Sequence, residues 1–228
     1  MNEIRIYEVG GAVRDRILGV PSKDIDYAVE APSYEDMKNY ITADGAEIFL
    51  ESPEYVTIRA RMGKTVADFV LCRKDGTYSD GRRPDSVEIG TIYDDLARRD
   101  FTINAIAIDE YGNYIDPFNG IRDIENRVIR CVGNSEDRMR EDYLRLLRAA
   151  RFSITKRMVI NDEIERLFYN NSMLSSFALS VSVDRIREEL YKMFNYSTLD
   201  TIDFFGRYKG FSLACFNNLW LKPTSEKR

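Results

Sequence analysis

The pattern of hydrophobic and polar positions changes character partway along the chain. In the first half, short stretches with the two-residue period of a strand alternate with short helical stretches. From about Ser135 onward, apolar residues recur at helical spacing, as at Leu144, Leu147 and Ala150. The change predicts an α+β chain, with a head domain of mixed strands and helices over residues 1–134 and a helical part over 135–228.

The first half contains recognisable start and stop signals for these elements. Ser33 and Thr91 are each followed three residues later by an aspartate, which is typical of a helix N-terminus. Gly63 and Lys64 predict a two-residue hairpin turn. Residues 73–85 contain two Asp-Gly pairs and a proline without apolar periodicity, which predicts a mobile loop. The predicted strands are residues 4–9, 24–30, 46–51, 55–62, 65–72, 105–109 and 114–116, and the predicted helices of this half are 12–18, 34–43 and one beginning after Thr91.

Composition narrows the class of protein. No apolar run reaches the roughly 18 residues that a membrane span requires, and the N-terminus lacks the basic and apolar stretches of a secretory signal. The three cysteines, Cys72, Cys131 and Cys215, are odd in number and widely spaced, which is typical of reduced thiols. We therefore expect a cytoplasmic protein without a membrane partner.

Histidine is absent from the 228 residues, which excludes a Ser-His-Asp triad, a His-ligated zinc site and a histidine general base. Catalysis would then depend on carboxylates, and any metal would be a hard cation with oxygen ligands. The net charge of −5 argues against a nucleic-acid binder with a basic surface throughout. It leaves room for a local basic patch.

Two aspartates, Asp24 and Asp26, are two residues apart on a predicted strand. Side chains two apart on a strand project to the same face, so both carboxylates aim at one place and could bridge a pair of Mg²⁺ ions. Many solvated strand ends show the same pattern, so the pair needs support from elsewhere in the chain.

Asp68 gives that support, because it interrupts the otherwise apolar predicted strand over residues 65–72. We expect it to share a face with Val66 and Val70, where an unpaired buried carboxylate would be costly. A third metal ligand explains the residue. A salt bridge to Arg59 or Arg61 on the hairpin partner is the alternative.

Gly10 and Gly11 separate the first strand from the first helix. Glycines allow close approach of backbone to phosphate, and free N–H groups at a helix start attract anionic oxygens. A tight strand-to-helix turn is the alternative, although Arg14 and Asp15 follow directly and the carboxylate strand comes next.

Several segments together resemble the class II tRNA nucleotidyltransferases and bacterial poly(A) polymerases, members of the DNA polymerase β-like nucleotidyltransferase superfamily. In order, they are residues 10–15 with 24–26, 98–105, 116–123, 141–152 and 183–190. The resemblance spans about residues 5–195. It implies a nucleotidyltransferase head, built of a mixed sheet with helices, followed by a helical neck and a truncated body.

The resemblance also implies roles for residues at matching positions. Asp24 and Asp26 would hold two Mg²⁺ ions, with Asp68 as the third catalytic carboxylate. The residues implied in nucleotide binding within the head are Gly10, Gly11, Arg14, Arg99, Asp100 and Asn104.

In the segment over residues 141–152, the resemblance implies that Asp142 and Arg145 contact the Watson–Crick edge of the incoming base. We expect them three apart on one helix, hence neighbours on one face. An aspartate accepts from the exocyclic amine that cytosine and adenine share, which would select CTP and ATP. Arg148 and Arg151 are assigned to nucleotide binding with them. A surface ion pair between Asp142 and Arg145 is the alternative.

The activity implied is template-independent nucleotidyl transfer from CTP and ATP to an RNA 3′ end, with CCA addition to tRNA as the leading hypothesis. Poly(A) addition, partial addition of CC or A, transfer to a non-tRNA acceptor, and a non-catalytic RNA-binding module are the alternatives.

Two features depart from the family pattern. Only about 75 residues follow the segment over 141–152, where relatives continue into a longer helical body and tail. Arg83 stands where the family usually has histidine, which indicates either neutral drift or altered control of adenine addition. An apolar C-terminal group, Leu213, Phe216, Leu219 and Trp220, either closes the core or forms an interface in a homo-oligomer.

Overall fold

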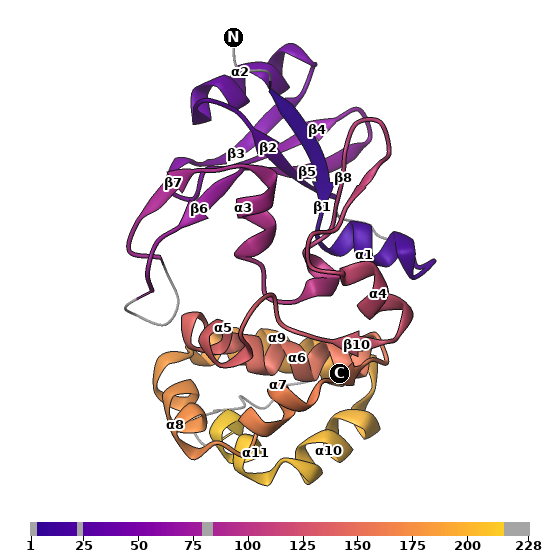
Figure 1. The fold of residues 1–228 in the computed structure, drawn as a ribbon, viewed down its shortest axis with the longest axis vertical. Helices are drawn as coiled ribbons and strands as arrows, with labels where there is room; N and C mark the ends of the chain where they lie inside the picture. Colours follow the sequence, from indigo (N-terminus) through magenta and orange to yellow (C-terminus); the bar gives the residue numbers. More distant parts are fainter. Residues whose placement is uncertain (1–3, 22–24, 79–83, 217–228) are drawn as a thin grey trace, which may run out of the picture. The chain divides into compact units, whose positions relative to one another are not determined.

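A computed structural model describes residues 4–21, 25–78 and 84–216 (Figure 1). The described chain forms two compact units, one reaching Ser135 and one beginning at Glu136. Each is described by itself. Unit 1 contains a seven-stranded sheet with helices and unit 2 is almost wholly helical, which confirms the predicted α+β class.

The sheet of unit 1 has the strand order β3-β4-β5-β2-β1-β8-β9. Strands β2 and β5 run parallel and all other neighbours run antiparallel, so the sheet is mixed as predicted. The strands are β1 (Arg5–Val9), β2 (Ile25–Glu30), β3 (Glu47–Ser52), β4 (Thr57–Met62), β5 (Thr65–Leu71), β8 (Ala107–Ile108) and β9 (Tyr114–Ile115).

The hairpin between β4 and β5 forms at the predicted turn. Met62 pairs with Thr65, and Gly63 takes a positive φ of 61°, which the tight connection requires. Strand β4 begins two residues later than predicted, because Pro53–Tyr55 forms a 3₁₀ turn (η1) ahead of it.

The two faces of the sheet are covered differently. Helix α2 (Tyr34–Ala43) begins at Ser33, whose hydroxyl accepts from the backbone N–H of Asp36 as predicted, and it buries Met37 and Ile41 with Phe69 of β5. On the opposite side, α3 (Ile92–Ala97) packs against the part of the sheet formed by β1, β2 and β8 (Figure 1). The part of that second face over β4 and β5 stays open to a cavity.

Helix α3 shows the predicted capping arrangement. The Thr91 hydroxyl accepts from the Asp94 backbone N–H, and the Asp94 carboxylate accepts from the backbone N–H of Thr91 at 2.8 Å. The backbone N–H and the hydroxyl of Thr91 both donate to the Asp94 carboxylate, and these hydrogen bonds lower the pKa of Asp94. The helix start is therefore fixed by local sequence.

The prediction of a loop over residues 73–85 is wrong at its start. Strand β6 (Arg73–Asp75) pairs antiparallel with β7 (Val87–Ile89). All three side chains of β7 are exposed, so this ribbon buries no continuous apolar face and shows no alternation to recognise. Residues 79–83, which include Arg83, lie outside the described part of the chain. The other elements of unit 1 are α1 (Gly11–Ile17), η2 (Thr102–Asn104), α4 (Gly120–Glu125) and β10 (Val128–Ile129).

Unit 2 is built from helices around an aromatic core. Phe168 contacts the rings of Phe204 and Phe211 at centroid distances of 5.6 and 4.9 Å. The expectation of helices alone is wrong at the two-residue strand β11 (Val159–Ile160). The helices are α5 (Ser135–Glu141), α6 (Leu144–Thr155), α7 (Asp162–Leu167), α8 (Asn171–Ser180), α9 (Val183–Tyr196), α10 (Thr198–Arg207) and α11 (Lys209–Phe216).

The apolar C-terminal group only partly joins this core. Phe216 packs edge-on against Phe205 at 4.9 Å, whereas Leu213 is 70% exposed. Leu219 and Trp220 lie outside the described residues. The expectation that the group closes the core therefore holds for Phe216 and is wrong for Leu213.

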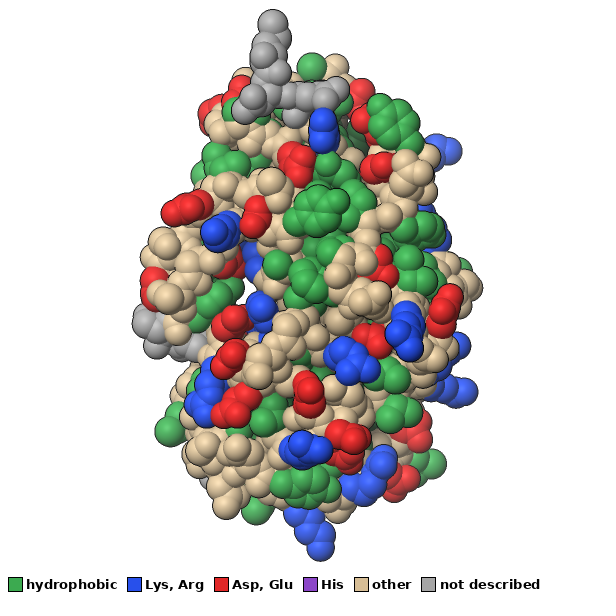
Figure 2. Space-filling model, viewed as in Figure 1, with side chains coloured by type: hydrophobic (Ala, Val, Ile, Leu, Met, Phe, Trp, Pro, Cys, Tyr) green, Lys and Arg blue, Asp and Glu red, His purple; other side chains and the backbone are tan. Residues whose placement is uncertain are grey.

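Acidic and basic side chains are interspersed over the surface seen in Figure 2. This mixture agrees with the modest net charge of −5. Among the described residues, no helix is long and apolar enough to cross a membrane.

Candidate functional site

Two of the three predicted catalytic carboxylates are neighbours on the sheet. Asp26 of β2 is the register partner of Asp68 of β5 in the parallel pair, so both project from the same face about 4.8 Å apart at the backbone. Both line a cavity of about 420 Å³. Asp24 lies outside the described residues, and within the described ones no three His, Cys, Asp or Glu side chains gather into a metal-binding group.

The argument that Asp68 is a costly buried carboxylate is wrong. Its face of β5 is the less covered one, because Ala67 and Phe69 are the residues that point into the core. The Asp68 side chain is 34% exposed, and its Oδ1 lies 3.5 Å from Nε of Arg59. The predicted alternative of a salt bridge to the hairpin partner is thus present, and the role in metal binding stays a prediction.

Gly10 lies beside the carboxylates and cannot be replaced without strain. Its φ of 74° and ψ of −133° form a combination that side chains other than glycine disfavour. A Cβ there would lie 2.8 Å from Nη1 of Arg99 and 3.7 Å from Oδ2 of Asp26. Gly11 follows as the first residue of α1. The glycine therefore lets the backbone approach a basic and an acidic side chain at once.

The predicted residues Arg14, Asn104 and Asp100 form one buried hydrogen-bonded chain. Arg14 Nη1 donates to Oδ1 of Asn104 at 2.5 Å, and Asn104 Nδ2 donates to Oδ1 of Asp100 at 2.9 Å. Arg14 also donates to the neighbouring Asp15. These contacts between α1 and η2 fix the orientation of both polar side chains.

Asp95, which sequence reasoning missed, anchors the two arginines next to the cavity. Its side chain is fully buried; Oδ1 accepts from Arg98 and Oδ2 accepts from Arg99 at 2.8 Å. Burial alone would raise the pKa of Asp95, but the two guanidinium groups hold it below its ordinary value. The spacing of three and four residues from Asp95, across the C-terminal end of α3, is a sequence signal that could have identified this cluster.

The segment over residues 116–123 contacts η2, the 3₁₀ turn that carries Asn104. Both Asp116 oxygens accept from backbone N–H groups at the start of α4, that of Gly120 at 2.6 Å. Thr102 of η2 donates to Asp123 of α4 at 2.7 Å, and Gly120 packs so closely against the Thr102 backbone that no side chain would fit. This segment positions η2 and takes no part in the cavity.

The second set of predicted residues lies in unit 2. Asp142 lies at the junction between α5 and α6, so the prediction that it shares a helix with Arg145 is wrong. Its Oδ1 accepts from the backbone N–H of Leu144. Both of its oxygens accept from Arg185 of α9, at 3.2 and 2.7 Å. The chain breaks its helix here, and a long-range arginine fixes the aspartate.

Arg145 is held by other partners than Asp142. Its Nη1 donates to the backbone carbonyl of Arg138 and to Oε2 of Glu141, both at 2.7 Å. The predicted alternative of an ion pair between Asp142 and Arg145 is replaced by two separate pairs. Each of the two predicted base-contacting residues therefore has its own positioning partner.

Arg148 and Arg151 lie further along α6, where both contact neighbouring side chains of unit 2. Arg151 donates to the buried Glu189 of α9, and its guanidinium lies 4.0 Å from the ring centroid of Phe152. Arg148 lies 5.6 Å from the same ring. Burial would raise the pKa of Glu189, but the charges of Arg151 and Arg148 lower it. These contacts join α6 to α9, and the nucleotide-binding role stays a prediction.

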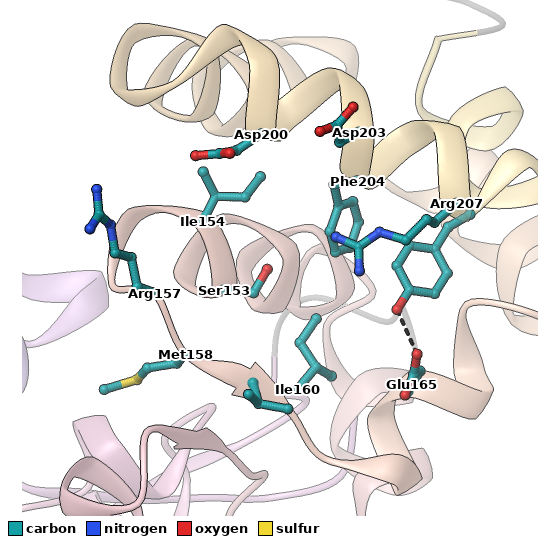
Figure 3. Close-up of a pocket in the computed structure, with 12 residues that line it drawn as sticks. Ser153, Ile154, Arg157, Met158, Ile160, Glu165, Asp200, Asp203, Phe204 and Arg207 are labelled. Atoms are coloured by element: carbon teal, nitrogen blue, oxygen red, sulfur yellow. Dashed lines mark hydrogen bonds between the residues drawn. The ribbon is translucent and has the colours of Figure 1, made fainter.

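Unit 2 has a cavity of its own, of about 560 Å³, between α6, α7 and α10 (Figure 3). Arg157 and Arg207 line it together with Asp200, and Tyr208 donates to Glu165 at 2.7 Å. Burial and this carboxylate raise the pKa of Tyr208. None of the predicted site residues line this cavity.

Comparison with known proteins places these features in a family. A model described as the poly A polymerase head domain matches residues 6–130. The CCA-adding enzyme of Geobacillus stearothermophilus is 38% identical over 195 residues, which cover 82% of this chain and 45% of that enzyme. The CCA-adding enzyme of Oceanobacillus iheyensis is 40% identical over 190 residues, with the same coverage of 82% and 45%.

Solved structures give the same result. The crystal structure of the Bacillus stearothermophilus CCA-adding enzyme in complex with CTP has a TM-score of 0.76 at 32% identity, covering 93% of this chain and 53% of that one. A tRNA nucleotidyltransferase complexed with a primer tRNA and an incoming ATP analog has a TM-score of 0.75 at 27% identity, covering 96% and 61%. The likeness confirms the resemblance and the fold class. The chain spans about half the length of the curated relatives it matches.

Proposed function

The chain belongs to the poly(A) polymerase head-domain family, and from this premise we propose that it transfers nucleotides from CTP and ATP to the 3′ end of an RNA. The observation that supports this most is the pairing of Asp26 with Asp68 on one open face of the sheet, beside Gly10 and Arg99. No nucleic-acid template is needed, because the base is read by side chains of unit 2.

A metal ion fits the donor set of unit 1. Asp26 and Asp68 offer adjacent carboxylate oxygens, the ligands that Mg²⁺ prefers. We propose that they hold Mg²⁺ together with Asp24. The bound ions would neutralise charge on the phosphates and lower the pKa of the attacking hydroxyl.

The surrounding residues of unit 1 bind and orient the nucleotide. Gly10 and Gly11 let the backbone approach the triphosphate, and Arg99 supplies positive charge at a position fixed by Asp95. The buried chain from Arg14 through Asn104 holds polar groups rigid, so little ordering is required when substrate binds.

Base selection is assigned to the α5–α6 junction. Asp142, fixed by Arg185, accepts from the exocyclic amine of cytosine or adenine, and Arg145 donates to a ring acceptor. Uracil and guanine carry a carbonyl where the amine would be. Each carboxylate oxygen has two lone pairs. Oδ1 of Asp142 accepts from Leu144 and Arg185, whereas Oδ2 accepts from Arg185, so among these contacts Oδ2 keeps a lone pair for a base amine.

The proposed acceptor is a tRNA 3′ end, because the relatives are named for CCA addition and one solved structure contains a primer tRNA. We also propose a cytoplasmic location, consistent with the three cysteines, all buried and none in a disulfide.

The test is incubation with tRNA transcripts that end before C, after C and after CC, with each nucleoside triphosphate supplied separately. We expect CTP to extend the first two transcripts and ATP to extend the third. A continuing ladder from ATP alone would indicate poly(A) addition. Extension at only some steps would indicate a partial enzyme, and no extension at any step would contradict the proposal.

A further inference from the structure

The cavity on the sheet of unit 1 has two ends, which lie on opposite sides of the carboxylates. The register of the strands gives one row of side chains across the sheet, in the order Leu50, Arg59, Asp68, Asp26 and Val9. All five line the cavity. Beyond Val9 the chain continues into the glycine turn, so one end is glycine-rich and the other is formed by β3 and β4.

The end formed by β3 and β4 has no role in the function proposed so far, and none of the short motif segments named above includes it, although it lies within the matched residues 6–130. It combines an apolar residue, Leu50, which is 55% exposed, with the hydroxyl groups of Ser52 and Thr57 and the guanidinium of Arg59. A β-bulge next to Leu50 shifts the register of β3, and this shift places Leu50 opposite Arg59. A large exposed apolar side chain beside a cationic group suits a nucleotide, which has both apolar and anionic parts.

Arg59 is available to a ligand. Its side chain is 43% exposed, and Nε lies 3.5 Å from Oδ1 of Asp68, which is longer than a normal hydrogen bond. Arg61, two residues further along the same strand, is instead hydrogen-bonded to Glu47 at 3.1 Å. A guanidinium has five N–H donors, so Arg59 keeps donors for a second anion while it stays beside Asp68.

The geometry of phosphoryl transfer assigns the occupant of this end. The attacking and leaving oxygens lie on opposite sides of the reacting phosphorus. In the proposed function, on which this inference rests, the leaving pyrophosphate lies at the end with Gly10 and Arg99. The attacking hydroxyl must then approach from the end with Arg59.

We propose that this end binds the 3′-terminal nucleotide of the acceptor RNA, with Arg59 pairing with the phosphate on its 5′ side and Leu50 packing against its sugar. In the step that follows, the 3′-oxygen forms a bond to the α-phosphorus of the nucleoside triphosphate. The bond from that phosphorus to the bridging oxygen breaks, pyrophosphate leaves, and the hydroxyl proton passes to solvent.

The first experiment separates acceptor binding from nucleotide binding. For Arg59→Ala we expect the KM for a tRNA transcript ending in C to rise about tenfold or more, because a charge-assisted contact is lost, while the KM for CTP changes less than about twofold. Arg59→Lys, which keeps the charge, should recover part of the loss. Arg61→Ala is the control on the same strand and face, outside the cavity, and should leave both constants unchanged.

The second experiment tests the phosphate contact itself. The acceptor carries an uncharged methylphosphonate in place of the phosphate on the 5′ side of its terminal nucleoside, and its binding is measured by fluorescence anisotropy without nucleotide. The methylphosphonate should lower the affinity of wild type about tenfold. It should not lower the affinity of Arg59→Ala any further, because the substitution and the methylphosphonate remove the same interaction. Melting curves show whether each variant is folded.

Equal losses in wild type and Arg59→Ala would overturn the inference, as would an unchanged acceptor KM in Arg59→Ala. A KM for CTP that rises as much as that for RNA would place Arg59 on the nucleotide side and also overturn it. If wild type incorporates neither CTP nor ATP, the proposed function itself fails, and this outcome is distinguishable from the others.

Discussion

The cluster at Asp95 in unit 1 and the cluster at Asp142 in unit 2 hold their charged groups in opposite ways. In unit 1 the acid is the anchor, because the fully buried Asp95 fixes Arg98 and Arg99 beside the cavity. In unit 2 the arginine is the anchor, because Arg185 fixes Asp142 through both carboxylate oxygens. Unit 1 therefore offers positive charge, which suits phosphates, and unit 2 offers an acceptor, which suits a base amine.

The comparison also shows why the two sets respond differently to substitution. A buried carboxylate between two guanidinium groups is costly to disturb, because removing one partner leaves charge in a low-dielectric environment. The pair of Asp142 and Arg185 retains partial access to water, with side chains 18% and 22% exposed. We expect the largest effects in unit 1 and the more selective effects in unit 2.

The largest effect is expected for Asp26→Asn. A metal clamp contributes several kcal/mol to transition-state stabilisation, so single-turnover incorporation of labelled CTP should fall by about 10³-fold or more. The melting temperature should change little, since the side chain lies on the open face. Asp44→Asn, at an exposed helix end, is the control. Near-normal activity of Asp26→Asn would contradict the assignment.

Asp95→Asn should be the most destabilising change. Loss of a buried ion-pair partner costs about 3–5 kcal/mol in the free energy of unfolding at pH 7. The folded pKa of Asp95 is lowered, so its contribution is complete above its unfolded pKa of about 3.9 and is lost as pH falls through the folded value. Urea unfolding should therefore show that the difference in the free energy of unfolding between wild type and variant becomes smaller below about pH 4. A gap that widens in acid would show that the ion pair is not its source.

Gly10→Ala should lower kcat/KM for CTP by about 10²-fold. The new Cβ would force Arg99 to shift, and a substrate-positioning group that is displaced by about 1 Å lowers the rate by about this factor. Gly112→Ala is a suitable comparison. It also has a positive φ, of 84°, but nothing lies within 4 Å of a Cβ there. Both variants should lose stability, of about 1–3 kcal/mol, and only Gly10→Ala should lose activity. Equal activity in the two would remove Gly10 from the site.

The smallest effect is expected for Arg185→Lys, which keeps the charge but loses the two-pronged contact with Asp142. The preference for CTP over UTP, measured as a ratio of kcat/KM values, should fall about fivefold to tenfold with a smaller change in rate. An unchanged ratio would show that Arg185 has no part in orienting the aspartate.

Sequence predicted the elements whose determinants are local. The helix starts at Ser33 and Thr91 depend on side chains three residues away, and the hairpin at Gly63 depends on its turn, so all three are confirmed. The ribbon of β6 and β7 was missed because its exposed side chains carry no apolar period.

The residues of the candidate site could be identified from the sequence, but their contacts and surroundings were harder to predict. The carboxylate of Asp68 was identified for a wrong reason, since its face of the strand is open and Arg59 lies beside it. The contact of Arg185 with Asp142 joins residues 43 positions apart, which no local spacing signals. The break between α5 and α6 also went unseen, because helical spacing continues on either side of it.

The central claim is that the base is chosen in unit 2 and the chemistry is performed in unit 1. The most direct test is the ratio of kcat/KM for CTP to that for UTP in Asp142→Asn, compared with wild type and with Arg99→Ala. An asparagine amide can donate to the uracil carbonyl, so we predict that the ratio falls at least about tenfold in Asp142→Asn. Arg99→Ala should lower both values and leave the ratio unchanged. An unaltered ratio in Asp142→Asn, or a collapsed ratio in Arg99→Ala, would contradict the claim.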